Sequence, residues 1–248
     1  MILVFVAGLF LGVLLNLVII RLPLERNSVG GWPRCTRTGQ PLAWWQLLPL
    51  VGWLLQRGKA SNGKALHWVY PLVEMLTAVT ITWLYATYGL SWFYGYLVFI
   101  TSILIVTGAI DWLHRFIYTF VVLGAVVLAL GATLLLPDLN IAHAGMGALV
   151  AGGVFILLFL LAQFLFPARS APFGLGDVYL GIFIGAAVGL PHLAPSLFYG
   201  VLMAGFVAVL IVIGKYLLRR RDLPEYLSYG TYLCLGVIVY LLTHDIRG

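Results

Sequence analysis

The sequence predicts an all-α, polytopic membrane protein with eight transmembrane helices and a cytoplasmic loop between the first two. Three observations support this fold class. Hydrophobic residues make up 62% of the 248 residues and charged residues only 9%, which leaves too little polar surface for a water-soluble domain. The apolar residues fall into runs separated by Pro, Gly or charged clusters. Nearly all cations lie between alternate runs, as membrane orientation requires.

The first apolar run, residues 2–20, is long enough to cross about 30 Å of hydrocarbon, and it ends at Arg21. A cleaved signal peptide is the alternative interpretation. However, no cation precedes the run and no small-residue cleavage site follows it. We therefore predict that residues 1–20 form a retained transmembrane helix.

Residues 21–67 change in composition to Arg, Lys, Pro, Gly and Trp, and we predict a folded loop or very small domain there. Residues 68–248 are predicted to form a seven-helix transmembrane domain. Its apolar runs cover 68–88, 92–110, 116–136, 146–166, 177–190, 195–214 and 227–243. The run at 177–190 is short for a span, so we expect its upstream end to be re-entrant or shielded within the bundle.

Cations predict the orientation, because loops rich in Lys and Arg remain in the cytoplasm. With the first loop inside, all of the 14 Lys and Arg residues except Arg247 are cytoplasmic. The sequence thus predicts a multi-pass protein of the inner membrane with both termini outside the cytoplasm. The net charge of +6 then reflects orientation among membrane lipids, and no nucleic-acid partner is expected.

Three of the eight acidic residues, Glu74, Asp111 and Asp177, lie within or beside predicted spans. A carboxylate in such a place is costly unless it is paired or neutralised, so each is a candidate functional residue. Asp111 ends the third span and Asp177 opens the sixth, and the alternation of helices brings both to the cytoplasmic interface.

Two carboxylates that meet in a partly dry site share a proton, because both cannot easily ionise together. The ionised member is able to take a proton from an attacking water, while the protonated member hydrogen-bonds a scissile carbonyl. Asp177 could equally cap the start of a helix. On spacing alone both roles stay open for this residue.

Glycines surround Asp177 in the sequence FGLGD, a GxGD motif in which Gly174 and Gly176 would let a peptide backbone approach closely. Downstream, glycines recur every four residues, at Gly181, Gly185 and Gly189. This repeat favours close packing against a neighbouring membrane helix.

Two further residues are secondary candidates. Glu74 lies about two turns inside the second predicted span, where a structural role and a role in shaping the site both stay open. His114 follows Asp111 by one turn and could influence its ionisation. For His114 and Arg115 the sequence favours anchoring at the membrane interface.

The chain carries an ordered series of motifs along almost its whole length. They are GVLLNLVIIRLP from Gly12, PLAWWQLLPLVGWLLQRG from Pro41, YPLVE ending at Glu74, AID ending at Asp111 and FGLGD ending at Asp177. In order and spacing this series resembles the bacterial prepilin peptidases, the GxGD-type intramembrane aspartic peptidases that mature type IV pilins and type II secretion pseudopilins. Ser228-Tyr229-Gly230 lies where that family usually has Pro-Phe-Gly before its last helix.

The resemblance implies an aspartic endopeptidase with Asp111 and Asp177 as the catalytic pair. Its substrates would be prepilins or pseudopilins, cleaved from the cytoplasmic side after a glycine that ends a basic leader. The peptidase step needs no cofactor. Many members of the family also methylate the new N-terminus with S-adenosylmethionine.

The sequence also departs from the family pattern. The family usually has two CxxC pairs that bind a structural zinc, and those positions here read Cys35, Thr38, Ala60 and Gly63. Since structural zinc needs about four protein ligands, we expect no zinc. The usual Ile-Pro-Asp after the first aspartate reads Ile117-Tyr118-Thr119, and a frequent lysine after the second is Tyr179. These changes bear on substrate range and methyl transfer.

Three other functions remain as alternatives. A presenilin-like protease shares the GxGD motif, but the C-terminal Pro-Ala-Leu signature of such proteases is absent from this sequence. A proton-coupled transporter would place carboxylates near the middle of the bilayer rather than at span ends, and no internal repeat supports one. A noncatalytic assembly factor of a pilus or secretion machine is supported only by the loss of the loop cysteines.

Overall fold

The computed structural model describes residues 1–24, 34–35, 38–60, 62–165, 174–216 and 227–247. Within these ranges the chain is helical, with two isolated β-bridges and no strand, so the all-α prediction is confirmed. Phe173 of the FGLGD motif lies outside the described residues, as do the predicted cytoplasmic cations Arg26, Arg37, Arg169, Arg219, Arg220 and Arg221. The chain divides into two compact units, Met1–Tyr94 and Gly95–Gly248.

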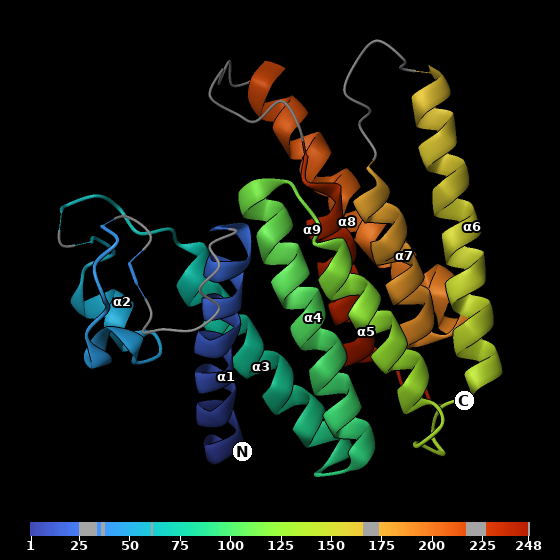
Figure 1. Ribbon diagram of the computed structural model, residues 1–248, viewed down its shortest axis with the longest axis horizontal. Helices are drawn as coiled ribbons and strands as arrows, with labels where there is room; N and C mark the ends of the chain where they lie inside the picture. Colours follow the sequence, from blue (N-terminus) through green and yellow to red (C-terminus); the bar gives the residue numbers. More distant parts are fainter. Residues whose placement is uncertain (25–33, 36–37, 61, 166–173, 217–226, 248) are drawn as a thin grey trace. The chain divides into compact units, whose positions relative to one another are not determined.

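The first unit is built on α1 (Ile2–Arg21) and α3 (Val69–Tyr88), which lie side by side in Figure 1. Glycines make this contact close, because a Cβ added at Gly8 would lie 2.7 Å from the Cα of Ala78. The buried amide of Asn16 donates to the carbonyl of Tyr70 at 2.9 Å and to Glu74 Oε1 at 3.1 Å. Small residues and one polar bridge therefore hold this helix pair together.

In the described part of the region between α1 and α3 the helices are short: η1 (Leu22–Leu24), η2 (Trp44–Leu47) and α2 (Val51–Leu55). Two glutamines connect η2 and α2. Gln46 accepts from the backbone N–H of Ala43 at 2.8 Å and donates to Gln56 Oε1 at 3.0 Å. Gln56 in turn donates to the carbonyl of Gly52 at 2.7 Å. These hydrogen bonds order the described part of the loop, and a folded loop or very small domain over the whole of 21–67 stays a prediction.

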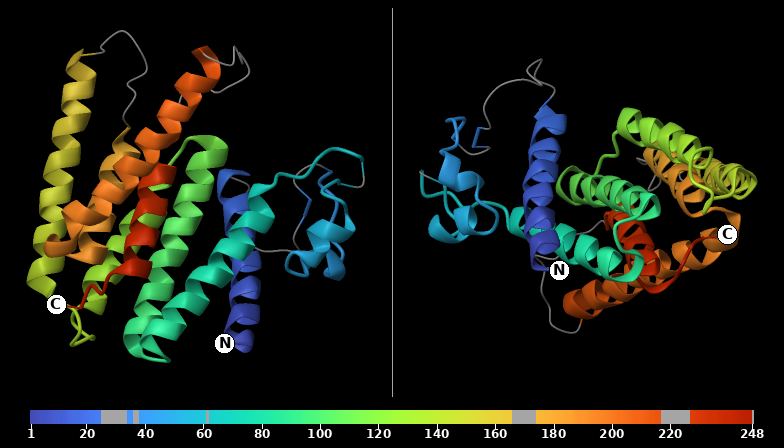
Figure 2. Two further views of the ribbon diagram at one scale, coloured as in Figure 1. Left: turned by 180° about the vertical axis from the view of Figure 1, so that it is seen from behind. Right: turned by 90° about the horizontal axis from the view of Figure 1, so that it is seen from below.

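The second unit contains most of α4 (Trp92–His114) together with α5 (Thr119–Ala132), α6 (Ile141–Leu165), α7 (Leu175–Val188), α8 (Leu190–Tyr216) and α9 (Tyr229–Thr243). Helix α7 packs against α5 and α6, and α8 packs against α9 (Figures 1 and 2). Helix α4 meets α9 closely, since a Cβ added at Gly108 would lie 3.2 Å from the Cβ of Cys234. These contacts fix the helix ends that carry the acidic residues.

Helix α7 is largely enclosed within the second unit, with Leu180, Phe183 and Ile184 fully buried. Its glycines permit this. A Cβ at Gly185 would run into the carbonyl of Gly147 on α6, and one at Gly181 would lie 2.8 Å from the ring of Phe155. Gly189 ends the helix with a φ of 74°, which only glycine adopts readily. The packing role of the glycines is confirmed. The upstream end of the run is not shielded where the structure describes it, since Leu175 is 52% exposed.

Five helices in the described part of the chain are long and apolar enough to cross a membrane. They are Ile2–Arg21, Val69–Tyr88, Trp92–His114, Ile141–Leu165 and Leu190–Lys215. The helices at Thr119–Leu135, Leu175–Val188 and Tyr229–Thr243 are shorter. All coincide with apolar runs of the sequence, so the chain is a multi-pass membrane protein, whereas the total of eight spans remains a prediction.

Two helices begin about five residues before the predicted spans. Asn140 caps α6, because its side-chain oxygen accepts from the N–H groups of Ala142 at 2.8 Å and His143 at 3.3 Å. Helix α8 begins at Leu190, with Pro191 in its first turn, where a proline costs no hydrogen bond. Pro195, where the predicted span began, lies inside this helix.

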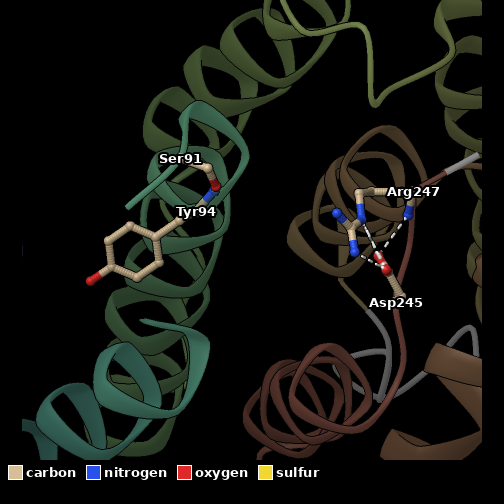
Figure 3. A network of polar contacts seen from close by, with 4 residues as sticks. All are labelled: Ser91, Tyr94, Asp245 and Arg247. Atoms are coloured by element: carbon tan, nitrogen blue, oxygen red, sulfur yellow. Dashed lines mark hydrogen bonds and ion pairs between the residues drawn. The ribbon is translucent and has the colours of Figure 1, made fainter. Parts of the chain in front are cut away.

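Two polar contacts mark helix ends (Figure 3). The hydroxyl of Ser91 accepts from the N–H of Tyr94 at 3.0 Å and so caps the start of α4. Arg247, the one cation predicted outside the cytoplasm, donates through Nε to Asp245 Oδ2 at 2.8 Å. These hydrogen bonds hold the pKa of Asp245 below its usual range. Because the pair is half exposed, it contributes little to stability.

Candidate active site

Asp111 lies in the last turns of α4 and is 7% exposed. Its Oδ2 atom accepts two hydrogen bonds from Thr231 on α9, one from the backbone N–H at 2.7 Å and one from the hydroxyl at 3.0 Å. The two residues are 120 positions apart in the chain. The start of α9 therefore determines where the Asp111 carboxylate points.

Asp177 lies in the first turn of α7, after the helix cap Gly174. Its Oδ2 atom accepts from the N–H of Gly174 at 3.0 Å, while the N–H of Asp177 donates to the carbonyl of Gly174 at 3.1 Å. This reciprocal pair is a helix cap, so the capping role considered for Asp177 is present. It uses one carboxylate oxygen and leaves Oδ1 without a hydrogen bond in the described part of the chain.

The surroundings of the two aspartates meet at one side chain. The side chain of Ile117 connects their surroundings. A Cβ at Gly176, next to Asp177, would lie 2.9 Å from the Cβ of Ile117. One at Gly230 would lie 3.2 Å from the Cδ1 of Ile117 and 3.0 Å from Asp111 Oδ2. Thus the connection after α4 and the starts of α7 and α9 meet at Ile117.

Two further charged or polar residues lie at or next to these helix ends. The guanidinium of Arg115 exerts its charge on Asp111. Arg115 has a φ of 54°, and its N–H donates to the carbonyl of Asp111 at 2.8 Å, which closes the end of α4. Tyr229, at the start of α9, interacts electrostatically with Asp177. The site therefore combines two carboxylates, a cation and a phenol at the ends of three helices.

The structure places the two glycines of the GxGD motif differently. Gly176 lies against Ile117, so a side chain there would push into the site. Gly174 is exposed, with a φ of −102° that any residue adopts, and it acts through its backbone cap. The expected approach of a substrate backbone to these glycines stays a prediction.

Two models of known protein families match this chain. The Bacterial Peptidase A24 N-terminal domain matches residues 6–88, and the Type IV leader peptidase family matches residues 98–213. The chain belongs to the type IV leader peptidase family. It is therefore a membrane-embedded peptidase, and the resemblance drawn from its motifs is confirmed.

Relatives of this peptidase carry the name prepilin leader peptidase/N-methyltransferase. The Myxococcus xanthus protein is 28% identical over 84% of this chain, which spans 62% of that protein. The Xanthomonas campestris protein is 26% identical, with 96% of this chain and 90% of the relative covered. The Bacillus subtilis protein is 28% identical, with 89% and 86% covered. No solved structure matches.

Glu74 belongs to the first unit of the peptidase, where both of its oxygens are used. Oε2 accepts from the N–H of Leu50 at 2.7 Å, and Oε1 accepts from Asn16 at 3.1 Å. Glu74 thus ties the loop to α1 and α3, which is the structural role left open by the sequence. His114 is exposed at the end of α4, in keeping with an interfacial anchor, and Arg115 is the cation that acts on Asp111.

The zinc positions of the peptidase family do not fit a metal here. Near the first position the N–H of Gly39 donates to the carbonyl of Cys35 at 2.8 Å, and at the second the N–H of Gly63 donates to that of Ala60 at 2.9 Å. Among Cys35, Thr38, Ala60 and Gly63, Cys35 offers the one thiol. In the described residues no cluster of three or more His, Cys, Asp or Glu could hold a metal ion. Zinc independence remains a prediction.

The sequence analysis missed four residues of the site: Arg115 as a charge partner, Ile117, Gly230 and Thr231. Gly230 and Ile117 could have been found from the sequence, since both lie in segments that were compared with family motifs. Thr231 gave no such signal, because a threonine at the start of an apolar helix is unremarkable until the fold places it beside Asp111.

Proposed function

We propose that this peptidase removes the leader of type IV prepilins or type II secretion pseudopilins at the cytoplasmic face of the inner membrane. Asp111 and Asp177 are the catalytic pair. The main support is that the end of α4, which carries Asp111, and the start of α7, which carries Asp177, meet around the side chain of Ile117. Each is held through Oδ2, and neither Oδ1 is hydrogen-bonded within the described residues.

The proposed reaction needs one carboxylate ionised and one protonated. The ionised carboxylate takes a proton from a water molecule as the water oxygen bonds to the scissile carbonyl carbon. The protonated carboxylate hydrogen-bonds the carbonyl oxygen and stabilises the charge that develops there. When the C–N bond breaks, the proton passes to the departing amine, which becomes the new N-terminus.

The position of the pair favours this reaction over proton-coupled transport. Asp111 lies in the last turns of α4 and Asp177 in the first turn of α7. Carboxylates at helix ends suit a scissile bond that precedes the hydrophobic helix of a membrane-inserted substrate. A transporter would place them near the middle of the helices.

Methyl transfer from S-adenosylmethionine to the new N-terminus is a second part of the proposal. It rests on the names of the relatives, which join leader peptidase and N-methyltransferase. The cytoplasmic orientation of the loop rests on the distribution of cations. The peptidase mechanism described above depends neither on methyl transfer nor on the orientation of the loop.

Co-expression with a prepilin tests the proposal. Mass spectrometry of the recovered pilin should find the basic leader removed after its last glycine, and the same spectrum reports any methyl group on the new N-terminus. A variant carrying both Asp111→Asn and Asp177→Asn is the control. An unprocessed prepilin beside correctly inserted wild-type peptidase would contradict the proposal and favour a noncatalytic assembly factor.

A further inference from the structure

The hydroxyl of Thr231 has two neighbours at hydrogen-bonding distance. Its Oγ1 atom lies 2.9 Å from the carbonyl oxygen of Gly108 and 3.0 Å from Asp111 Oδ2. A hydroxyl has one proton to donate and two lone pairs that accept. It cannot donate to both neighbours at once.

Two arrangements of protons satisfy this geometry. With Asp111 ionised, the Thr231 hydroxyl donates to Oδ2. With Asp111 protonated on Oδ1, the oxygen left for water and substrate, the Thr231 hydroxyl continues to donate to Oδ2. In both arrangements the Thr231 backbone N–H, 2.7 Å away, continues to donate to Oδ2.

We infer that Thr231 is a positioning residue that holds Asp111 in one orientation in both of its protonation states. The inference rests on the proposed function, in which the protonation states of the pair alternate during each turnover. The backbone N–H and the hydroxyl both donate to Oδ2, which leaves Oδ1 to gain and lose the proton. The proton of Thr231 itself stays on its oxygen throughout.

Burial makes the hydroxyl hard to replace. Thr231 and Asp111 are each 7% exposed. Leu233 and Cys234, further along α9, are fully buried. Water has little access to take over a lost hydrogen bond at such a site. A buried acid without its partner pays a desolvation cost, and its side chain is free to rotate.

Kinetics of purified variants separate positioning from general structure. Thr231→Val keeps the shape and the backbone N–H but removes the hydroxyl, whereas Thr231→Ser keeps the hydroxyl. With a prepilin as substrate, Thr231→Val should lower kcat by about 10-fold to 100-fold, the usual effect of misplacing a catalytic group, with KM within about twofold of wild type. Thr231→Ser should recover kcat to within about threefold of wild type, because it restores the bond.

Thr243→Val is the matched control on the same helix. The Thr243 hydroxyl bonds to the carbonyl of Val239 at 2.9 Å at the other end of α9, and it is exposed. This variant should keep wild-type kcat and KM. If Thr231→Val does not accumulate, Thr231→Ala, which leaves space instead of filling it, provides the same comparison.

Wild-type kcat in the variant without the hydroxyl would overturn the inference, as would a Thr231→Ser enzyme no better than Thr231→Val. A rise in KM alone would also overturn it, since it would assign Thr231 to substrate binding. An inactive wild-type enzyme would instead contradict the proposed function, and this inference with it.

Discussion

Asp111 and Asp177 are each held through a single carboxylate oxygen, Oδ2 in both cases. A carboxylate has two oxygens and about four lone-pair sites, so one oxygen can fix the side chain while the other meets water or substrate. The donors differ. Asp177 is fixed within its own helix start by Gly174, whereas Asp111 is fixed from another helix by Thr231. The orientation of Asp111 therefore depends on the packing of α9.

Substituting Gly230 tests this dependence on α9. In Gly230→Ala the new methyl group would lie 3.0 Å from Asp111 Oδ2, so the carboxylate or the helix has to shift. We expect prepilin cleavage to fall at least about tenfold, because small displacements of a catalytic group are costly. The measurement is the rate of leader removal by equal amounts of inserted protein.

Gly205→Ala on α8 serves as the control for this substitution, since a Cβ there meets nothing within 4 Å. It should cleave at the wild-type rate. Equal rates for Gly230→Ala and Gly205→Ala would mean that the contact between α9 and Asp111 has no influence on catalysis.

The sequence identified the acids of the candidate site but not their supports. Glu74, Asp111 and Asp177 were recognisable because carboxylates are rare and costly in apolar segments. Thr231 bonds to Asp111, which is 120 positions away. Ile117, in the connection after α4, lies close to both Gly176 of α7 and Gly230 of α9. Such pairings depend on helix packing, for which a periodic apolar sequence offers many equivalent solutions.

At the scale of elements, α7 carries Asp177. Glycines on one face of α7 let it pack closely against α6. Gly185 meets the backbone of Gly147 on α6, and Gly181 meets Phe155. Gly185→Ala should lower the stability of the detergent-solubilised protein by about 1–3 kcal/mol, the usual cost of overpacking. Thermal unfolding followed by circular dichroism measures this change.

Gly153→Ala on α6 is the matched control for Gly185→Ala. This position is exposed and meets nothing within 4 Å, so alanine should leave the unfolding temperature unchanged or raise it slightly. Our description of the α6–α7 contact fails if Gly185→Ala unfolds at the wild-type temperature.

The loop between α1 and α3 is a second element whose stability can be tested. Backbone turns and the pair Gln46 and Gln56 hold it, and it offers one thiol. A strong chelator should therefore leave both leader cleavage and the protease resistance of the loop unchanged, and Cys35→Ser should be nearly silent. Gln46→Ala, in contrast, should speed proteolysis of the loop, because it removes two hydrogen bonds.

Stoichiometric zinc in the purified protein would contradict this account of the loop. So would activity that chelation removes and added zinc restores. Both are measured directly, by elemental analysis and by the cleavage assay.

The sequence predicted which segments form helices better than it predicted where the helices begin and end. Every predicted apolar run corresponds to a helix in the described part of the chain, because runs of this hydropathy have few other structures in a membrane. The ends were less predictable. Helix α6 begins early because Asn140 caps it, and α8 begins early because Pro191 fits a first turn. Both residues had been assigned to the connection between spans.

At the scale of the whole molecule, the distribution of cations makes a prediction about orientation that is independent of the site. In a background without Cys35 and Cys234, a cysteine placed in the 22–66 loop should resist an impermeant thiol reagent added to intact cells. A cysteine placed at Asn140 should react. Labelling of the first loop from outside would reverse the proposed orientation and move the aspartates to the other face of the membrane.

The central claim is that Asp111 and Asp177 form one catalytic pair. Its most direct test is cleavage of a purified prepilin by three single variants that are equally well inserted. Asp111→Asn and Asp177→Asn should each lose leader removal, because an amide can neither take the proton from water nor donate one to the departing amine. Glu74→Gln, which alters only the support of the loop, should retain it. Substantial cleavage by either asparagine variant would contradict the pair.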